Sequence, residues 1–195
     1  SGMLTINVIT DLFFASGIFG AAAGLSYANF LVQTPLGIIS HALLIPLQPT
    51  FASLTNPSDR KNLIRRIRQG LMYSSASMIA IGSLFITLAT PIVALIYARG
   101  AFESNAINLV SGLLIVYGLG MPAYLIRDLL VRVFYALGDG KTPFYYSFIG
   151  IFINIIFDWF LVGGPTPWGH QFPFNFGASG LVLATVAVNF LTSVM

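Results

Sequence analysis

Two polar side chains stand one helical turn apart in a strongly apolar part of the chain. Asn154 and Asp158 lie within a run, residues 143–169, that contains no other charged residue. Side chains at i and i+4 of a helix share a face, so the amide and the carboxylate are expected to point the same way. A carboxylate inside an apolar membrane segment is costly unless it is paired, protonated or bound to a cation. This pair therefore makes the chain a candidate transporter.

A second carboxylate is expected at a similar depth. Asp11 lies in the first apolar segment, with Asn7 one turn before it, and Thr185 lies two turns into the last segment. Carboxylate, amide and hydroxyl oxygens are hard ligands that suit a simple cation. The sharper hypothesis is a Na⁺ or H⁺ site among the first, fifth and sixth helices. The alternative is that each carboxylate is protonated, or faces an outer water-filled vestibule, and only joins helices together.

The composition requires lipid as the solvent for most of the chain. Of the residues, 56% are hydrophobic and only 8% are charged, against roughly a quarter charged in soluble domains. Residues 71–98 and 106–126 contain no Asp, Glu, Lys or Arg, and crossing a bilayer takes about 20 residues. The absence of cysteine excludes disulfides and thiolate metal sites. The predicted fold class is all-α, a polytopic membrane helix bundle.

Six membrane-spanning helices are expected, at about residues 1–16, 21–54, 71–98, 106–137, 144–162 and 178–195. The first and last of them are expected to be truncated, which would make the chain a piece of a longer protein. Prolines within the second helix, and Pro91 in the third, are expected to bend them. Five basic residues with interleaved Leu and Ile predict a short amphipathic helix at the membrane surface over residues 60–69.

The charges assign the two ends of the bundle to opposite sides of the membrane. With six segments in alternating directions, eight of the nine Lys and Arg residues fall on one side and Arg99 alone on the other. This bias predicts that the basic side is cytoplasmic. The basic cluster within residues 60–69 is short, and the orientation of the protein in the membrane and contact with lipid account for it. Nucleic acid is therefore not an expected partner.

Other polar residues give weaker indications. His41 lies in mid-span and suits either a proton relay or a hydrogen bond between helices, whereas His170 has no acidic neighbour to complete a metal site. Asp128 and Arg132 are spaced to pair at i and i+4. Arg127 lies where it could meet a phosphate group at the cytoplasmic mouth. No Walker motif, Ser/His/Asp arrangement or catalytic carboxylate pair is present, so an enzyme is not expected.

Several stretches resemble the MurJ/MviN lipid II flippases. Residues 4–16 (LTINVITDLFFAS) are similar to the seventh helix of that family, and residues 25–37 (LSYANFLVQTPLG) to the next one. Residues 132–143 (RVFYALGDGKTP) resemble its R-x-F-Y-A-L-x-D-x-K-T-P turn. Asn154 with Asp158, and Gly180-Leu181 before Asn189, fit the last two helices. The resemblance covers residues 1–195 and identifies them as a C-terminal six-helix lobe.

The resemblance implies membership of the multidrug, oligosaccharide-lipid and polysaccharide exporter superfamily. It implies a flippase that moves an undecaprenyl-pyrophosphate-linked peptidoglycan precursor by alternating access, together with an N-terminal lobe across a central cationic cavity. It also implies a sodium site whose ligands, carried over by position, are Asp11, Asn154, Asp158, Thr185 and the carbonyl of Leu181. Cavity-lining candidates are Asn29, Gln33 and Arg127. Many members have Arg where this chain has Phe30, so the resemblance supports the cation site better than the substrate site.

Two alternatives to a lipid II flippase stay open at this point. Another exporter of the superfamily would move a drug or a polysaccharide-linked lipid, and acidic residues in the missing lobe would favour a cationic drug. A non-transporting membrane scaffold would lose stability, but no transport, when Asp158 is replaced by Asn.

Overall fold

The computed structural model describes residues 2–54, 56–98, 102–162 and 176–194, with side chains from residue 9 onward apart from residue 57. These residues are helical with no strand, so the all-α prediction is confirmed. The α-helices are α1 (Gly2–Ala15), α2 (Ala21–Ile39), α3 (Ile45–Ser53), α4 (Arg60–Tyr97), α5 (Ser104–Ala136), α6 (Lys141–Leu161) and α7 (Ala178–Val194). Arg99 and His170 lie outside the described residues.

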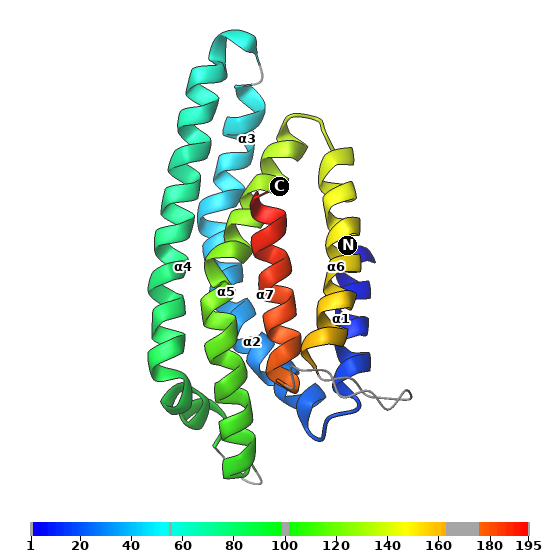
Figure 1. The fold of residues 1–195 in the computed structure, drawn as a ribbon. Coiled ribbons are helices and arrows are strands. Elements are labelled where there is room, and N and C mark those ends of the chain that lie inside the picture. Colours follow the sequence, from blue (N-terminus) through cyan, green and yellow to red (C-terminus); the bar gives the residue numbers. More distant parts are fainter. Residues whose placement is uncertain (1, 55, 99–101, 163–175, 195) are drawn as a thin grey trace.

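The chain runs up and down between two ends of the bundle (Figure 1). The α3–α4 and α5–α6 connections lie at the upper end, and the α1–α2 turn lies at the lower end, as the charge pattern predicted. Four helical segments are long and apolar enough to cross a membrane: Ala21–Ser53, Arg60–Tyr97, Ser104–Ala136 and Lys141–Val162. Helices α1 and α7 are shorter, with 14 and 17 residues. The basic residues of α4 and Lys141 belong to the α3–α4 and α5–α6 connections at the upper end, which the charge bias predicts to be cytoplasmic.

The predicted second helix is one continuous rod with a widened turn in its middle. A π-helical turn over Ser40–Leu44 joins α2 to α3. Pro46, just after it, lacks a backbone N–H and its ring would clash with the carbonyl four residues earlier, so a wider turn accommodates it. The proline-containing segment therefore bends without ending, as the sequence predicted.

The third span differs from its prediction. The sequence predicted a separate surface helix over residues 60–69, whereas α4 continues from Arg60 to Tyr97 as one helix of 38 residues. The only breaker between the two parts is Gly70, which a helix tolerates at a cost of about 1 kcal/mol. At 1.5 Å per residue α4 is about 57 Å long, so its basic first turns extend beyond the hydrocarbon. The expected kink near Pro91 is confirmed by non-helical angles at Leu88.

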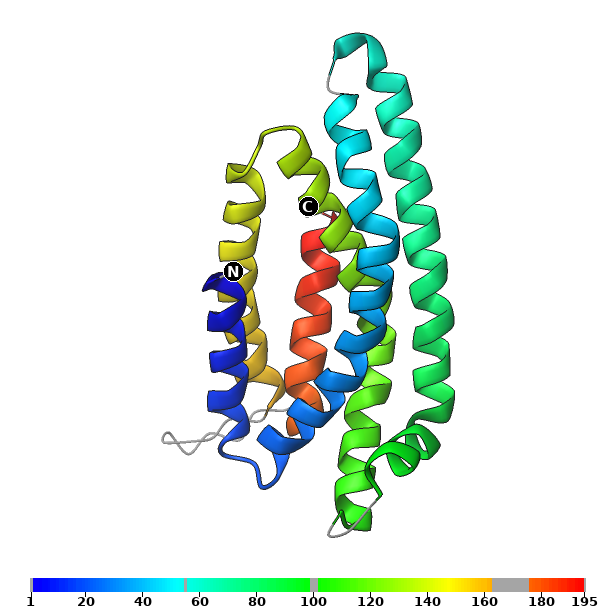
Figure 2. The ribbon, with the colours of Figure 1, turned by 180° about the vertical axis from the view of Figure 1, so that it is seen from behind.

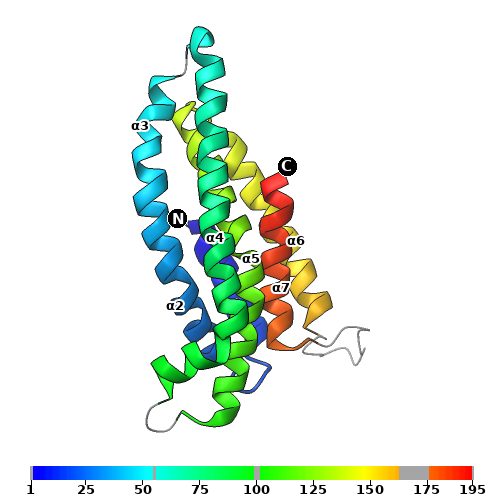
Figure 3. The same ribbon diagram turned by 90° about the vertical axis from the view of Figure 1, so that its left-hand side faces the viewer.

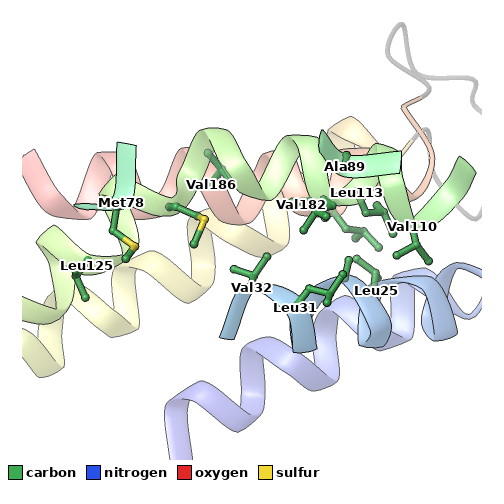
Figure 4. Close-up of a cluster of buried hydrophobic side chains, with 14 of the residues drawn as sticks. Leu25, Leu31, Val32, Met78, Ala89, Val110, Leu113, Leu125, Val182 and Val186 are labelled. Atoms are coloured by element: carbon green, nitrogen blue, oxygen red, sulfur yellow. The ribbon is translucent and has the colours of Figure 1, made fainter. Parts of the chain in front are cut away.

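The main apolar core lies where α5 packs between α2 and α4. Buried Leu25, Val32, Met78, Leu113 and Leu125 meet there (Figure 4). Helices α4 and α5 approach closely because two glycines face each other: a Cβ on Gly118 would lie 2.9 Å from the carbonyl oxygen of Gly82. Small residues at such crossings allow the close packing that holds membrane helices together.

A second group of helices packs on the other side of α5. Helix α7 lies against α5 and α6, and α1 lies against α6, as seen from two opposite sides in Figures 1 and 2. The side view in Figure 3 shows α4 and α7 on different sides of α5. The polar residues singled out in α1, α6 and α7 therefore share one interface, which borders the apolar core through Leu181, Val182 and Val186 of α7.

Candidate functional site

Helix α6 buries both members of the polar pair that the sequence singled out. Asn154 and Asp158 each have 0% of their surface exposed. The Asn154 amide Nδ2 donates a hydrogen bond of 2.7 Å to Asp158 Oδ2. The expectation that i and i+4 side chains share a face is confirmed, and that face is turned toward α1 and α7.

Helix α1 brings the second carboxylate to the same place. Asn154 Nδ2 also donates to Asp11 Oδ1 at 3.3 Å, so one amide group lies between the carboxylates of Asp11 and Asp158 and brings them close enough to interact. The expected similar depth of the two residues is confirmed. Two negative charges this close in an apolar bundle repel each other strongly, so the pair needs a shared proton or a bound cation.

Two oxygen atoms of this cluster are buried without a partner among the described residues. They are Asn154 Oδ1 and Asp158 Oδ1. Buried polar atoms are almost always hydrogen-bonded, and each exception needs an explanation. An amide oxygen and a carboxylate oxygen are acceptors and hard ligands, so their chemistry fits Na⁺. The residues whose side chains the structure describes contain no group of three or more His, Cys, Asp or Glu side chains that could hold a metal ion.

Helix α7 places the two remaining predicted ligands level with Asp158. A Cβ on Gly180 would overlap the backbone of Leu161, and one on Gly150 would lie 3.3 Å from Thr192 Cγ2. With this antiparallel alignment of α6 and α7, Asp158 falls between Leu181 and Thr185. Thr185 Oγ1 donates to the Leu181 carbonyl at 3.1 Å. Asn7, the further candidate of the depth argument, has no described side chain.

Arg127 joins three helices near the cytoplasmic end of the same interface. Its Nη1 donates to Asn189 Oδ1 of α7 at 3.1 Å, and its Nη2 donates to Ser147 Oγ of α6 at 3.3 Å. The sequence placed Arg127 at a substrate mouth and did not single out Asn189 or Ser147 as functional. Asn189 follows Thr185 by four residues, so the i, i+4 rule could have found it. Ser147 carries no comparable sequence signal.

The other two cavity candidates lie elsewhere, on the exposed face of α2. Asn29 and Gln33 are exposed, and Phe30 is 67% exposed. His41, also exposed, has its Nδ1 2.7 Å from the Gly37 carbonyl one turn earlier, which is a contact within its own helical segment and not the expected hydrogen bond between helices. A polar face on a spanning helix does not suit lipid. This face therefore suits a water-filled cavity or another part of the protein.

The expected ion pair at the end of α5 is confirmed and has a third member. Arg132 Nε donates to Asp128 Oδ1 at 3.1 Å. Ser40, in the π-helical turn, donates to Asp128 Oδ2 at 2.7 Å and accepts from Arg132 at 3.0 Å. The cluster fixes the turn between α2 and α3 onto α5. Sequence reasoning missed Ser40 because its partners lie about 90 residues away.

Comparisons with known proteins give one consistent result. A family model described as lipid II flippase MurJ matches residues 1–195. A probable lipid II flippase MurJ of Synechocystis is 49% identical over 189 residues, covering 97% of this chain and 33% of that protein. One from Rhizobium tropici is 31% identical over 78% of this chain and 29% of its own length.

A solved structure matches as well. A lipid II flippase MurJ in an inward closed conformation superposes with a TM-score of 0.79 at 26% identity, covering 98% of this chain and 38% of that one. The chain thus spans about a third of the length of the curated relatives that it matches.

Proposed function

The chain belongs to the lipid II flippase MurJ family, and on that premise we propose that it is one lobe of a transporter for a lipid-linked peptidoglycan precursor. Its long apolar helices make it part of a multi-pass protein of the bacterial inner membrane. The other lobe of the same protein is the partner that would complete the transport path. Such a protein moves its substrate between leaflets by alternating access and catalyses no covalent reaction.

The proposal includes a coupling cation, Na⁺ in preference to H⁺, held by α1, α6 and α7. The observation that carries it is the Asn154 amide between the carboxylates of Asp11 and Asp158, with two orphaned oxygens beside it. Thr185 and the Leu181 carbonyl would complete the ligand set from α7. A cation there neutralises the repulsion between the two carboxylates, so its binding favours the arrangement in which the three helices are packed together.

The substrate would meet the exposed polar face of α2. Asn29 and Gln33 present amide groups there that can bond to phosphate or sugar oxygens. Arg127 was grouped with them from the sequence, but it donates to α6 and α7 instead. We therefore assign the cavity to Asn29 and Gln33, together with groups of the other lobe.

Rescue of cell growth tests this function. The full-length parent protein is expressed in bacteria depleted of their own lipid II flippase, as wild type and as Asp158→Asn at equal membrane abundance. We expect rescue by wild type and by Asp139→Asn, a matched change of an exposed turn carboxylate, and no rescue by Asp158→Asn. Rescue by Asp158→Asn would remove the cation site from transport. Failure of the wild type would favour another exporter or a scaffold.

A further inference from the structure

Along most of its length, the buried face of α6 carries polar residues or glycine. Asp158, Asn154 and Gly150 are buried at successive intervals of four residues, and Ser147 follows three residues further. A helix face that only packs against neighbours in a membrane would carry small or apolar residues. This face instead leads from the candidate cation site toward the cytoplasmic end of the helix.

Helices α5 and α7 present matching polar side chains to that face. On α7 they are Thr185, Asn189 and Thr192, and on α5 they are Tyr117, Tyr124 and Arg127, each set spaced by three, four or seven residues. We call these six residues, with Ser147, Gly150, Asn154 and Asp158 of α6, the polar seam. Burying so many polar groups between membrane helices is costly and is characteristic of ion pathways.

Hydrogen bonds connect the cytoplasmic half of the polar seam. Arg127 donates to Asn189, and Asn189 Nδ2 donates to the Thr185 carbonyl at 2.7 Å. On the α5 side, Tyr124 lies three residues from Arg127 and seven from Tyr117 along the same helix. The Tyr124 hydroxyl is buried and has no hydrogen-bond partner in the described part of the chain. A buried hydroxyl of this kind suits contact with a passing water or ion.

The seam reaches a small opening at its cytoplasmic end. A cavity of about 50 Å³ is lined by Arg127, Ser147, Tyr146, Thr192 and neighbouring apolar residues. Arg127 lies 23 residues after the start of α5, about 35 Å along the helix, toward the end of α5 that is predicted to be cytoplasmic. None of the described carboxylates is within ion-pair distance of its guanidinium. An unpaired positive charge thus stands between this opening and the carboxylates.

We propose that the polar seam is the cytoplasmic access route of the cation site and that Arg127 is its gate. The inference rests on the proposed cation site. While Arg127 bonds to Asn189 and Ser147, its charge repels an entering cation and its side chain fills the gap between α5, α6 and α7. Entry requires the guanidinium to leave these two partners and turn toward the cytoplasmic opening.

Labelling an introduced cysteine with charged thiol reagents distinguishes a gating role of Arg127 from a purely structural one. The chain holds no cysteine, so Gly150→Cys, introduced into a full-length parent whose other cysteines are replaced, reports on the seam. A Cβ there meets only Thr192 and Val188, at 3.3 and 3.4 Å, and Thr192→Cys is the second position if Gly150→Cys does not fold. Inside-out vesicles are treated with positively or negatively charged methanethiosulfonate reagents. Phe148→Cys, on the exposed side of α6, is the labelling control.

Adding Arg127→Gln is expected to raise the ratio of cationic to anionic labelling rates at Gly150→Cys by roughly tenfold or more, because a repelling charge is removed. Arg132→Gln, which removes an arginine five residues away, and Arg127→Lys should leave the ratio within about twofold. Equal acceleration of both reagents would mean that Arg127 only packs the helices, and no acceleration would mean that the seam is closed; either result overturns the proposal. The labelling experiment requires neither Na⁺ binding nor transport. Its outcome is therefore independent of whether Asp158→Asn rescues growth.

Discussion

Helix α5 packs its two sides by different chemistry. Toward α4 it offers Gly118, which packs closely on Gly82, and toward α2 it offers Leu113, which packs on Gly24. Toward α6 and α7 it offers Tyr117, Tyr124 and Arg127. Lipid is as apolar as the first interface, so that interface is held by shape and close packing. The second interface buries polar groups at a cost, and its hydrogen bonds also join the helices. The difference distinguishes an interface built by close packing from one that we propose serves transport.

The largest loss of stability is expected where the backbones of α4 and α5 meet. Gly82→Val would push a side chain into the carbonyl of Gly118, and overpacking against backbone is expected to lower the free energy of unfolding by about 3 kcal/mol. Thermal unfolding of the full-length protein in detergent measures it. Gly112→Ala on α5, where an added Cβ meets nothing within 4 Å, is the matched control. Equal melting temperatures for the two variants would contradict the packing account.

A polar-to-apolar substitution in the polar seam is expected to lower the free energy of unfolding by slightly less. Asn154→Leu removes the donor to both carboxylates, and leaving buried acceptors unpaired is expected to cost about 2 kcal/mol. The matched change in the apolar core, Met121→Leu, conserves volume and should cost less than about 1.5 kcal/mol. If the two variants unfold at the same temperature, burial of polar groups does not distinguish the two regions.

Removing a hydrogen bond from the cluster of Ser40, Asp128 and Arg132 at the π-helical turn is expected to lower stability by a smaller amount. Ser40→Ala removes the hydroxyl that bonds to Asp128 and Arg132, and we expect a loss of about 1 kcal/mol, as for hydrogen bonds within membrane proteins. Ser83→Ala, whose hydroxyl bonds only to the Ala80 carbonyl of its own helix, should cost less. A larger loss for Ser83→Ala would mean that Ser40 does not hold the turn to α5.

The smallest effect on stability is expected at Asp139, in a turn outside both interfaces. Hydrogen bonds from the Thr142 side chain and from the backbone N–H groups of Thr142 and Lys141 lower the pKa of Asp139 below its ordinary value of 3.8. A lowered pKa stabilises the folded protein above pH 3.8, and that stabilisation is lost as the pH falls through the lowered pKa. Asp139→Asn should therefore show a weaker fall in melting temperature below pH 4 than wild type. An identical pH profile would contradict the capping contact.

The sequence predicted the helices and the grouping of Asp11, Asn154 and Asp158 because both follow from local periodicity. Apolar runs and charge bias gave the helices and their direction, and the i, i+4 rule with relative depth selected Asp11, Asn154 and Asp158. It could not predict that residues 60–69 continue into α4, because a single Gly leaves both outcomes open. It also could not pair Ser40 with Asp128 or Arg127 with Ser147, because such contacts depend on how distant helices align.

Sodium-dependent stabilisation tests the central claim, a cation site at Asp158, most directly. The melting temperature of the purified full-length protein is measured in NaCl and in choline chloride at equal ionic strength. Wild type is expected to gain about 2.7 kcal/mol at a Na⁺ concentration 100 times its dissociation constant, and Asp158→Asn to gain nothing. Equal stabilisation of the two proteins by Na⁺, with both folded in choline, would contradict a cation site at Asp158.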